Sequence, residues 1–298
     1  MRKVFDAIQI GGLAKQAVNA GMSGKVVGVT SKGIFLNSGD KILFLTDTTY
    51  KSPFNIQVRQ MELLSETLFL GDDCSLSTNS ITFPQNQIVI DLQLAEIWLL
   101  TKPPEINNTL TTQAERIDRI VQRMCEINPN KGWLFLANCG GSEPARLNSA
   151  DDRIKKNTMA FTKSFKVLNL PGCLASAKSI IGLGGGLTPS GDDWLTGFML
   201  LLTRVGQVDL IKQQFVINLG KSLVEMANQK TTTISTNRIE AASSGWAEEL
   251  FLDLVDHIFA AETNFRKTKI EALMGFGHSS GVDTCMGIFD AWSTSSLE

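Results

Sequence analysis

The sequence contains few of the residues that build metal and redox sites. It has two histidines and five cysteines in 298 residues. The cysteines are odd in number, lie far apart and never form a Cys-x-x-Cys pair, so we expect neither a zinc site nor a disulfide framework. Such cysteine usage is typical of a reducing cytoplasm, which is the expected location.

Long apolar runs and common nucleotide-binding motifs are also missing. No uninterrupted apolar stretch is long enough to cross a bilayer, and Asp6, Gln9 and Lys15 interrupt the apolar core that a signal peptide requires. A net charge of -2 offers no general attraction to nucleic acid or to an anionic membrane. The sequence has no Walker lysine motif and no dinucleotide fingerprint. We therefore expect a globular protein that binds a small molecule, with no nucleic acid and no membrane as partner.

The first third of the chain has the pattern of a β-rich domain. An amphipathic helix is expected from Lys3 to about Ala20, and short strand-like runs separated by turn residues follow it. The predicted strands are residues 26–29, 33–36, 41–46, 66–70, 81–83 and 87–90. This pattern predicts an antiparallel sandwich or small barrel. Two prolines at 103–104 mark the boundary, so the N-terminal domain is expected to be 1–103.

The remaining residues, 104–298, have the period of helices. Apolar residues recur at helical spacing over 117–127, 211–226 and 250–258, and further helices are expected over 150–165, 174–181 and 270–274. Residues 133–137 fit either a helix or a buried strand. The expected fold class is therefore α+β, with a mainly α-helical C-terminal domain after the β-rich one.

Glycines, hydroxyls and carboxylates are most crowded between residues 180 and 202. Gly184, Gly185 and Gly186 let the backbone come close to a ligand. A helix is expected to follow, with Thr188 as its N-cap and Pro189 as its first residue, or with a capping box that starts at Ser190-Gly191. The open N-terminus of such a helix attracts a phosphate or carboxylate, so we expect an anion site here.

Two aspartates follow in the first turn of that helix, and they allow two interpretations. Asp192 and Asp193 could simply cap their own helix. Alternatively, one of them faces the pocket, where it holds a divalent cation or takes a proton from a substrate. The glycine cluster favours the functional interpretation, because a simple cap needs no glycines.

A second segment repeats the pattern Ser-Gly-x-Asp-x-x-x-Gly ninety residues later. Ser280, Gly281, Asp283 and Gly287 match the residues at 190, 191, 193 and 197. We expect two glycine-entered helices whose N-termini point into one cavity, and the second of them brings His278 and Ser279. The alternative is a chance match of small residues. His278 is the candidate for acid–base work or for polarising a carbonyl, whereas a structural role is expected for His257.

A hydroxyl-rich run lies between two predicted helices. It contains Thr232, Thr233, Ser235, Asn237 and Arg238. These residues could form a simple loop. They could also bind an anion, with Arg238 as a bidentate clamp for a carboxylate or phosphate. We favour binding because the two other anion-binding elements flank the run.

These three segments resemble, in the same order, the signature segments of the AllH (YlbF-like) family, which includes a subunit of oxamate carbamoyltransferase. The likeness is strongest over Gly182–Asp193 and continues through the threonine-rich run and the turn at 277–281. The resemblance implies a role in anaerobic allantoin and purine degradation, in which a carbamoyl group passes between oxalurate and phosphate. The products are oxamate and carbamoyl phosphate. It also implies FdrA-like and YlbE-like companion subunits.

Under that hypothesis the chain is an enzyme subunit without a covalent nucleophile. Carbamoyl transfer requires a bound phosphate, a polarised carbonyl and a group that moves the proton of the amide nitrogen. The glycines, Ser190, Thr232 and Thr233 would hold phosphate, and His278 would act on the carbonyl or the proton. Arg238 would hold the oxamate carboxylate, and Asp192 or Asp193 would orient these groups.

Two other function classes stay open. One is a magnesium-dependent hydrolase or phosphotransferase in which Asp192, Asp193 and Asp283 bind the metal, so magnesium is the one cofactor considered. The other is a non-catalytic subunit that binds an anion and regulates. Loss of a metal requirement in Asp193→Asn would favour the first class, and binding without turnover would favour the second.

Overall fold

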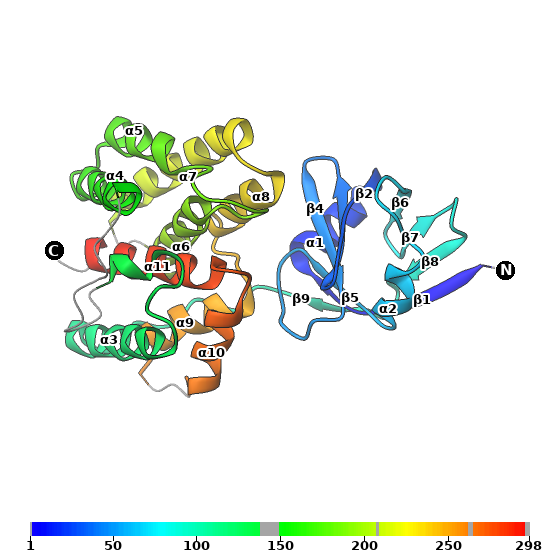
Figure 1. Ribbon diagram of the computed structural model, residues 1–298, viewed down its shortest axis with the longest axis horizontal. Coiled ribbons are helices and arrows are strands. Elements are labelled where there is room, and N and C mark those ends of the chain that lie inside the picture. The colour runs from blue at the N-terminus through cyan, green and yellow to red at the C-terminus, as the bar shows by residue number, and fades with distance from the viewer. Residues whose placement is uncertain (1, 138–148, 207–208, 262–264, 296–298) are drawn as a thin grey trace. The chain divides into compact units, whose positions relative to one another are not determined.

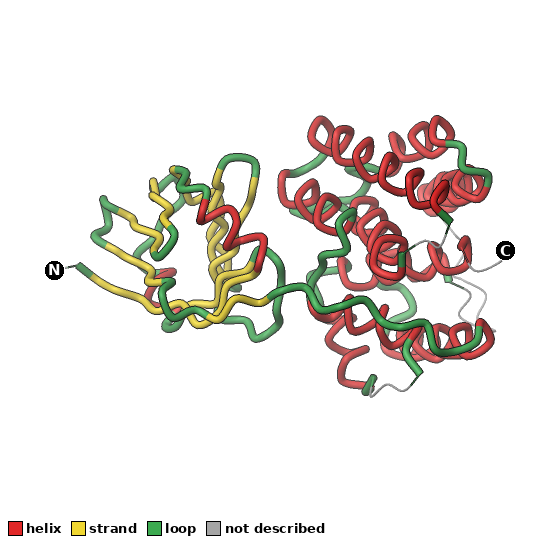
Figure 2. Tube along the Cα trace, turned by 180° about the vertical axis from the view of Figure 1, so that it is seen from behind, coloured by secondary structure: helices red, strands yellow, loops and turns green. Residues whose placement is uncertain are grey.

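The computed structural model describes residues 2–137, 149–206, 209–261 and 265–295 (Figure 1). The chain divides into two compact units, Met1–Thr101 and Lys102–Glu298. Strands make up most of the first unit and helices make up the second (Figure 2). The expected α+β class, with a β-rich part before a helical part, is therefore confirmed.

The N-terminal unit is a closed barrel of eight strands, with a ninth strand on its side. Alternating residues explain the strands: in β6, Cys74 and Leu76 are buried while Asp73, Ser75 and Ser77 are exposed. The order is β5-β4-β3-β2-β6-β7-β8-β1, and β5 pairs with β1 to close the barrel, while β9 adds to β1. The strands are β1 Lys3–Gly11, β2 Ser23–Thr30, β3 Gly33–Ser38, β4 Lys41–Thr46, β5 Asn55–Val58, β6 Asp73–Ser77, β7 Ser80–Phe83, β8 Ile88–Asp91 and β9 Glu96–Trp98.

The barrel is mixed, whereas the sequence pattern predicted an antiparallel one. Strand β1 runs parallel to β8 and β9, and β4 runs parallel to β5. Short hairpins join β2 to β3, β3 to β4 and β6 to β7, so these pairs are antiparallel. No hairpin connects the strands of the parallel pairs. Turn residues in the sequence therefore cannot predict that these strands pair.

Two local predictions in this unit are wrong. The expected helix from Lys3 is strand β1 up to Gly11, and only α1, Gly12–Asn19, is helical. Phe5 and Ala7 are buried while their neighbours are exposed, which is the period of a strand. The expected strand over 66–70 consists of turns that follow helix α2, Met61–Ser65, and Phe69 and Leu70 are exposed there.

The C-terminal unit is a helical domain, and its predicted helices are present. The predicted helix–strand ambiguity at 133–137 resolves as a short 3-10 helix, η1. The elements are α3 Leu110–Ile127, η1 Gly132–Leu136, α4 Ser149–Lys166, α5 Leu170–Ile180, α6 Ser190–Val205, α7 Leu210–Lys230, α8 Thr233–Ala242, α9 Glu249–Phe259, α10 Lys267–Gly275 and α11 Ser280–Ser295. No helix in the described part of the chain is long and apolar enough to cross a membrane.

Helices α6 and α11, which carry the two copies of the repeat, cross at very short range. A Cβ on Gly197 would lie 1.9 Å from the carbonyl oxygen of Thr284, and a Cβ on Gly287 would lie 1.9 Å from that of Trp194. Only glycine permits this approach, and each of the two helices places a glycine against the backbone of the other. The final glycine of each copy is therefore a packing residue that brings the two helices together.

The second residue of each copy also makes an equivalent contact. A Cβ on Gly191 would lie 2.0 Å from the carbonyl oxygen of Ile180, and a Cβ on Gly281 would lie 1.8 Å from that of Leu273. Each glycine thus packs its helix start against the end of the preceding helix. The repeat is therefore a matched pair of helix entries, and a chance match of small residues does not account for it.

One cysteine does not follow the sequence expectation. Cys125 is disulfide-bonded, although the cysteine spacing predicts no disulfide framework. Cys74, Cys173 and Cys285 are free and buried. Burial raises the pKa of the Cys173 thiol to about 12, so this thiol stays protonated and packs as a small apolar side chain.

Candidate functional site

The segment 182–187, called the glycine loop below, joins α5 to α6. Residues 184–187 are exposed, and Gly184 has a φ of +121°, a conformation that other residues rarely adopt. A Cβ on Gly184 would lie 2.7 Å from the backbone nitrogen of Ser190, so the loop lies close against the start of α6. By contrast, a Cβ on Gly185 would meet nothing within 4 Å. The loop therefore presents bare backbone that is open at Gly185.

The start of α6 is less open than the sequence indicates. The helix begins at Ser190 with Pro189 as its N-cap residue, and no side chain caps it. Both predicted caps, at Thr188 and at Ser190, are therefore wrong. The loop itself satisfies part of the helix end, because the Gly191 N–H donates to the Leu183 carbonyl at 2.9 Å.

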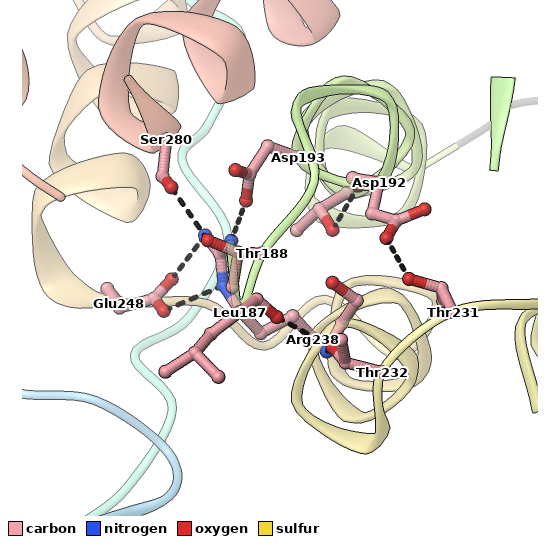
Figure 3. A network of polar contacts seen from close by, with 11 residues as sticks. Leu187, Thr188, Asp192, Asp193, Thr231, Thr232, Arg238, Glu248 and Ser280 are labelled. Atoms are coloured by element: carbon pink, nitrogen blue, oxygen red, sulfur yellow. Dashed lines mark hydrogen bonds and ion pairs between the residues drawn. The ribbon is translucent and has the colours of Figure 1, made fainter. Parts of the chain in front are cut away.

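A hydroxyl just before the first copy of the repeat contacts the first residue of the second copy. Thr188 Oγ1 and Ser280 Oγ lie 2.8 Å apart, although 92 residues separate them in the chain (Figure 3). The Ser280 hydroxyl lowers the pKa of Asp193, and the Ser190 hydroxyl lowers the pKa of Asp283. Each serine of the repeat thus stabilises the charged aspartate of the other copy. Two helix starts therefore converge, as the sequence predicts.

The hydroxyl-rich run fixes the glycine loop from a second side. Most of this run is helix α8, and Thr232 is its N-cap. Thr232 Oγ1 donates to the Leu187 carbonyl at 2.6 Å and accepts from the Ser235 N–H at 3.1 Å. Both hydrogen-bonding roles of this hydroxyl are thus used within the protein. Thr233, the next residue, is exposed.

Asp192 ties the glycine loop to the start of the hydroxyl-rich run. Its Oδ1 accepts from the Gly182 N–H at 2.8 Å. Its Oδ2 accepts from Thr231 Oγ1 (Figure 3). Burial raises the pKa of this carboxyl, and these two hydrogen bonds oppose that effect. The side chain is only 1% exposed. Asp192 therefore holds the loop in shape from beneath.

Arg238, the expected clamp for a substrate carboxylate, is occupied by carboxylates of the protein. Its Nε donates to Glu248 Oε1 at 3.1 Å, and its Nη1 is paired with Asp193 Oδ1 (Figure 3). The guanidinium also lies 5.9 Å from the ring centroid of Phe251 and 5.8 Å from that of Phe276. Arg238 is 9% exposed. It is therefore an internal cation at the centre of the site.

Asp193 has an unusual electrostatic environment. Burial raises its pKa to about 7 against the opposing effect of Arg238, and Asp283 raises it further. Arg238 is shared with Glu248, so the two carboxylates together exceed the single positive charge. Asp193 Oδ2 is buried and has no hydrogen-bond partner. This carboxyl can therefore gain or lose a proton near neutral pH.

Asp283 and Asp192 do not converge with Asp193 on a common point. Asp283 Oδ1 accepts from the Trp133 N–H at 2.7 Å, at the start of η1, whereas Asp192 binds the glycine loop. Within the described ranges, no group of three or more His, Cys, Asp or Glu side chains could hold a metal ion. The magnesium alternative therefore lacks a ligand set in this part of the chain.

The turn at 277–280 brings His278 to the same region. His278 is exposed and lies two residues before Ser280, which contacts Thr188. Ser279 is half-buried, and its hydroxyl lowers the pKa of Asp283. Residues 277–281 match a Gly-x-Ser-x-Gly pattern, but they join two helices, whereas a nucleophile elbow joins a strand to a helix.

The other predicted residues lie inside the helical unit. Ser235 and Asn237 are 1% and 3% exposed, so these residues of α8 face the interior of the helical unit. His257 stacks on Phe265 with 4.7 Å between the ring centroids, and burial lowers its pKa to about 4.

Sequence reasoning missed Glu248, and it placed Thr231 in the hydroxyl-rich run without a role of its own. Glu248 precedes α9 and has no motif around it, yet it makes two of the ion-pair contacts of Arg238. A buried arginine requires carboxylates nearby, but only the fold shows that Arg238 is buried. Thr231 lay at the edge of the hydroxyl-rich run, and only the fold shows that it binds Asp192.

The residues of this site lie within a segment that is similar to a known protein family. Residues 180–292 match the model of the family described as oxamate carbamoyltransferase subunit AllH. The matched segment contains the glycine loop, α8, Glu248 and the second copy of the repeat. No solved structure matches the chain. Residues 180–292, which lie within the helical unit, are therefore similar to the AllH family.

Proposed function

We propose that the chain is a carbamoyl-transfer enzyme subunit. The reaction converts oxalurate and phosphate into oxamate and carbamoyl phosphate, in the anaerobic degradation of allantoin and purines, in the cytoplasm. One observation carries the proposal. Within the segment that matches the AllH family, the N-cap residue of α8 holds an exposed loop of bare glycine backbone, and Thr188, the residue after the loop, contacts Ser280 of α11.

The proposed anion site consists of exposed groups. The backbone of Gly184–Gly186 and the exposed hydroxyl of Thr233 hold the phosphate, with the Ser279 hydroxyl beside them. His278, on the exposed turn next to this loop, polarises the carbamoyl oxygen or moves a proton. These groups need no covalent intermediate, since phosphate itself attacks the carbamoyl carbon.

The buried groups support the site from below. Asp192 and Thr232 hold the glycine loop, and Arg238 positions Asp193 instead of binding the oxamate carboxylate directly. This assignment follows from hydrogen bonding, because Thr232 already uses both roles of its hydroxyl within the protein. The same groups would serve an anion-binding regulatory subunit, which the experiment below distinguishes.

The exposed glycine loop favours a site that a partner completes. The family description names a subunit, and we propose FdrA-like and YlbE-like companion subunits for this chain. A covered site excludes water and strengthens each electrostatic contact with the substrate. We therefore expect the companions to cover the glycine loop during turnover.

Turnover by the chain alone and with its companions tests the proposal. We expect carbamoyl phosphate to form from oxalurate and phosphate in the assembled complex, and oxalurate to form from carbamoyl phosphate and oxamate in reverse. Omission of this chain should abolish both reactions. If the companions alone are fully active, the chain is not part of the transfer site. If the omitted chain changes only the substrate affinity, it is a regulatory subunit.

A further inference from the structure

The segment 230–232 lies along the glycine loop, from the first residue of the loop to the last. A Cβ on Gly182, where the loop begins, would lie 2.9 Å from the carbonyl oxygen of Lys230. At the other end, Thr232 Oγ1 donates to the carbonyl oxygen of Leu187 at 2.6 Å (Figure 3). The backbone of Lys230 is therefore fixed beside the start of the loop.

The ammonium group of Lys230 lies at the same end of the loop. Lys230 is the last residue of α7, and its Nζ donates to the carbonyl oxygen of Lys178, in the last turn of α5. This bond uses one of the three donors of the ammonium, so two remain for a ligand. Both lysines are exposed, and within the described residues neither forms an ion pair with a carboxylate.

The buried groups under the glycine loop supply no free positive charge. Arg238 is paired with Asp193 and Glu248, so its charge is already offset within the protein. The carboxyl of Asp192 holds the loop through the Gly182 N–H and adds no positive charge. A phosphate on the bare backbone of the loop therefore needs a cation from the exposed side chains at its edge.

We propose that Lys230 is the cation of the anion site, and that its ammonium binds the same phosphate group as the bare backbone of the glycine loop. Lys178 adds a second positive charge at that end of the loop. The inference rests on the proposed function for the identity of the substrates, and it adds the residue that selects the phosphate group. Phosphate and carbamoyl phosphate carry more negative charge at neutral pH than oxamate or oxalurate, so a lysine at the loop favours them.

Calorimetric titration of the purified chain with inorganic phosphate tests the assignment. Lys230→Met should weaken phosphate binding about 10- to 100-fold, because it removes a charge-assisted hydrogen bond. Lys230→Arg keeps the charge and should retain most of the affinity. Lys221→Met is the matched control, since Lys221 is another exposed lysine of α7, and it should bind phosphate as the wild type does. Equal affinity in Lys230→Met and wild type, or no phosphate binding by the wild type, would overturn the proposal.

The salt dependence of phosphate binding separates a binding role of Lys230 from a structural one. Salt screens exposed charges, so added salt should weaken phosphate binding more steeply in the wild type than in Lys230→Met. A lysine that only holds the end of α5 would change the melting temperature of the ligand-free chain and leave this salt dependence intact. The same salt dependence in both proteins would contradict the proposal.

Steady-state kinetics of the assembled complex relate the lysine to the proposed reaction. We expect Lys230→Met to raise the KM for phosphate about 10- to 100-fold, with little change in kcat or in the KM for oxalurate, because Lys230 binds phosphate and does not react. A lower kcat at an unchanged KM for phosphate would overturn the assignment. If the complex transfers no carbamoyl group while Lys230→Met still abolishes phosphate binding by the chain, the anion site is supported and the proposed reaction is wrong.

Discussion

Arg238→Met is expected to lower the free energy of unfolding of the helical unit by about 3–5 kcal/mol. The substitution leaves Asp193 and Glu248 buried without their shared cation, and a methionine of similar length keeps most of the packing against Phe251 and Phe276. Urea denaturation followed by tryptophan fluorescence measures the loss. At low pH the loss should shrink, since protonation removes the unpaired charges.

The matched control is Arg119→Met. Arg119 pairs with Glu115 at the surface, where its side chain is 74% exposed, so the expected change is within about 0.5 kcal/mol. A triple variant with Asp193→Asn and Glu248→Gln should recover part of the stability that Arg238→Met loses. An Arg238→Met protein as stable as the wild type would show that the buried ion pairs do not hold the site together.

His278→Ala is expected to lower the turnover of the assembled complex by a factor of about 10²–10⁴. His278 lies on the exposed turn beside Ser280 and supports no packing, so the variant should fold and bind phosphate normally. Steady-state kinetics and calorimetric titration with phosphate measure the two effects separately.

His257→Gln is the control for that variant. His257 is stacked on Phe265, so its loss should reduce stability and leave the rate per folded molecule unchanged. If His278→Ala changes only the affinity for phosphate, the chain is an anion-binding module. If it changes neither, the turn at 277–280 lies outside the site.

Periodicity and turn signals predicted much of the fold, because those features depend on neighbours in sequence. The apolar stripes of α3, α7 and α9 are clear, and so are the hairpin strands β3 and β4. The closure of the barrel depends on the pairing of β1 with β5 and β8, which lie far away in the chain. No local signal in the sequence identifies such long-range pairs. The sequence around Lys3 therefore gives no sign that strand β1 has partners, and its residues are compatible with an amphipathic helix.

The candidate site shows the same division. The repeat predicted that two helix starts meet, and the glycine contacts between Gly197 and Thr284 explain how. The sequence does not show whether Arg238 binds a substrate or pairs with carboxylates of the protein. The ion pair with Glu248, which lies in a separate segment, shows that Arg238 pairs with carboxylates of the protein.

The most direct test of the central claim is the melting temperature of the purified chain with carbamoyl phosphate, phosphate, oxamate or oxalurate. A ligand that binds only the folded state raises this temperature by mass action. We expect carbamoyl phosphate or oxamate to stabilise the wild type and Gly185→Ala, and to have no effect on Gly185→Val. A Cβ on Gly185 meets no protein atom within 4 Å, so the larger valine should block the ligand without harm to the fold. Equal stabilisation of Gly185→Val and wild type would contradict a binding site at the glycine loop.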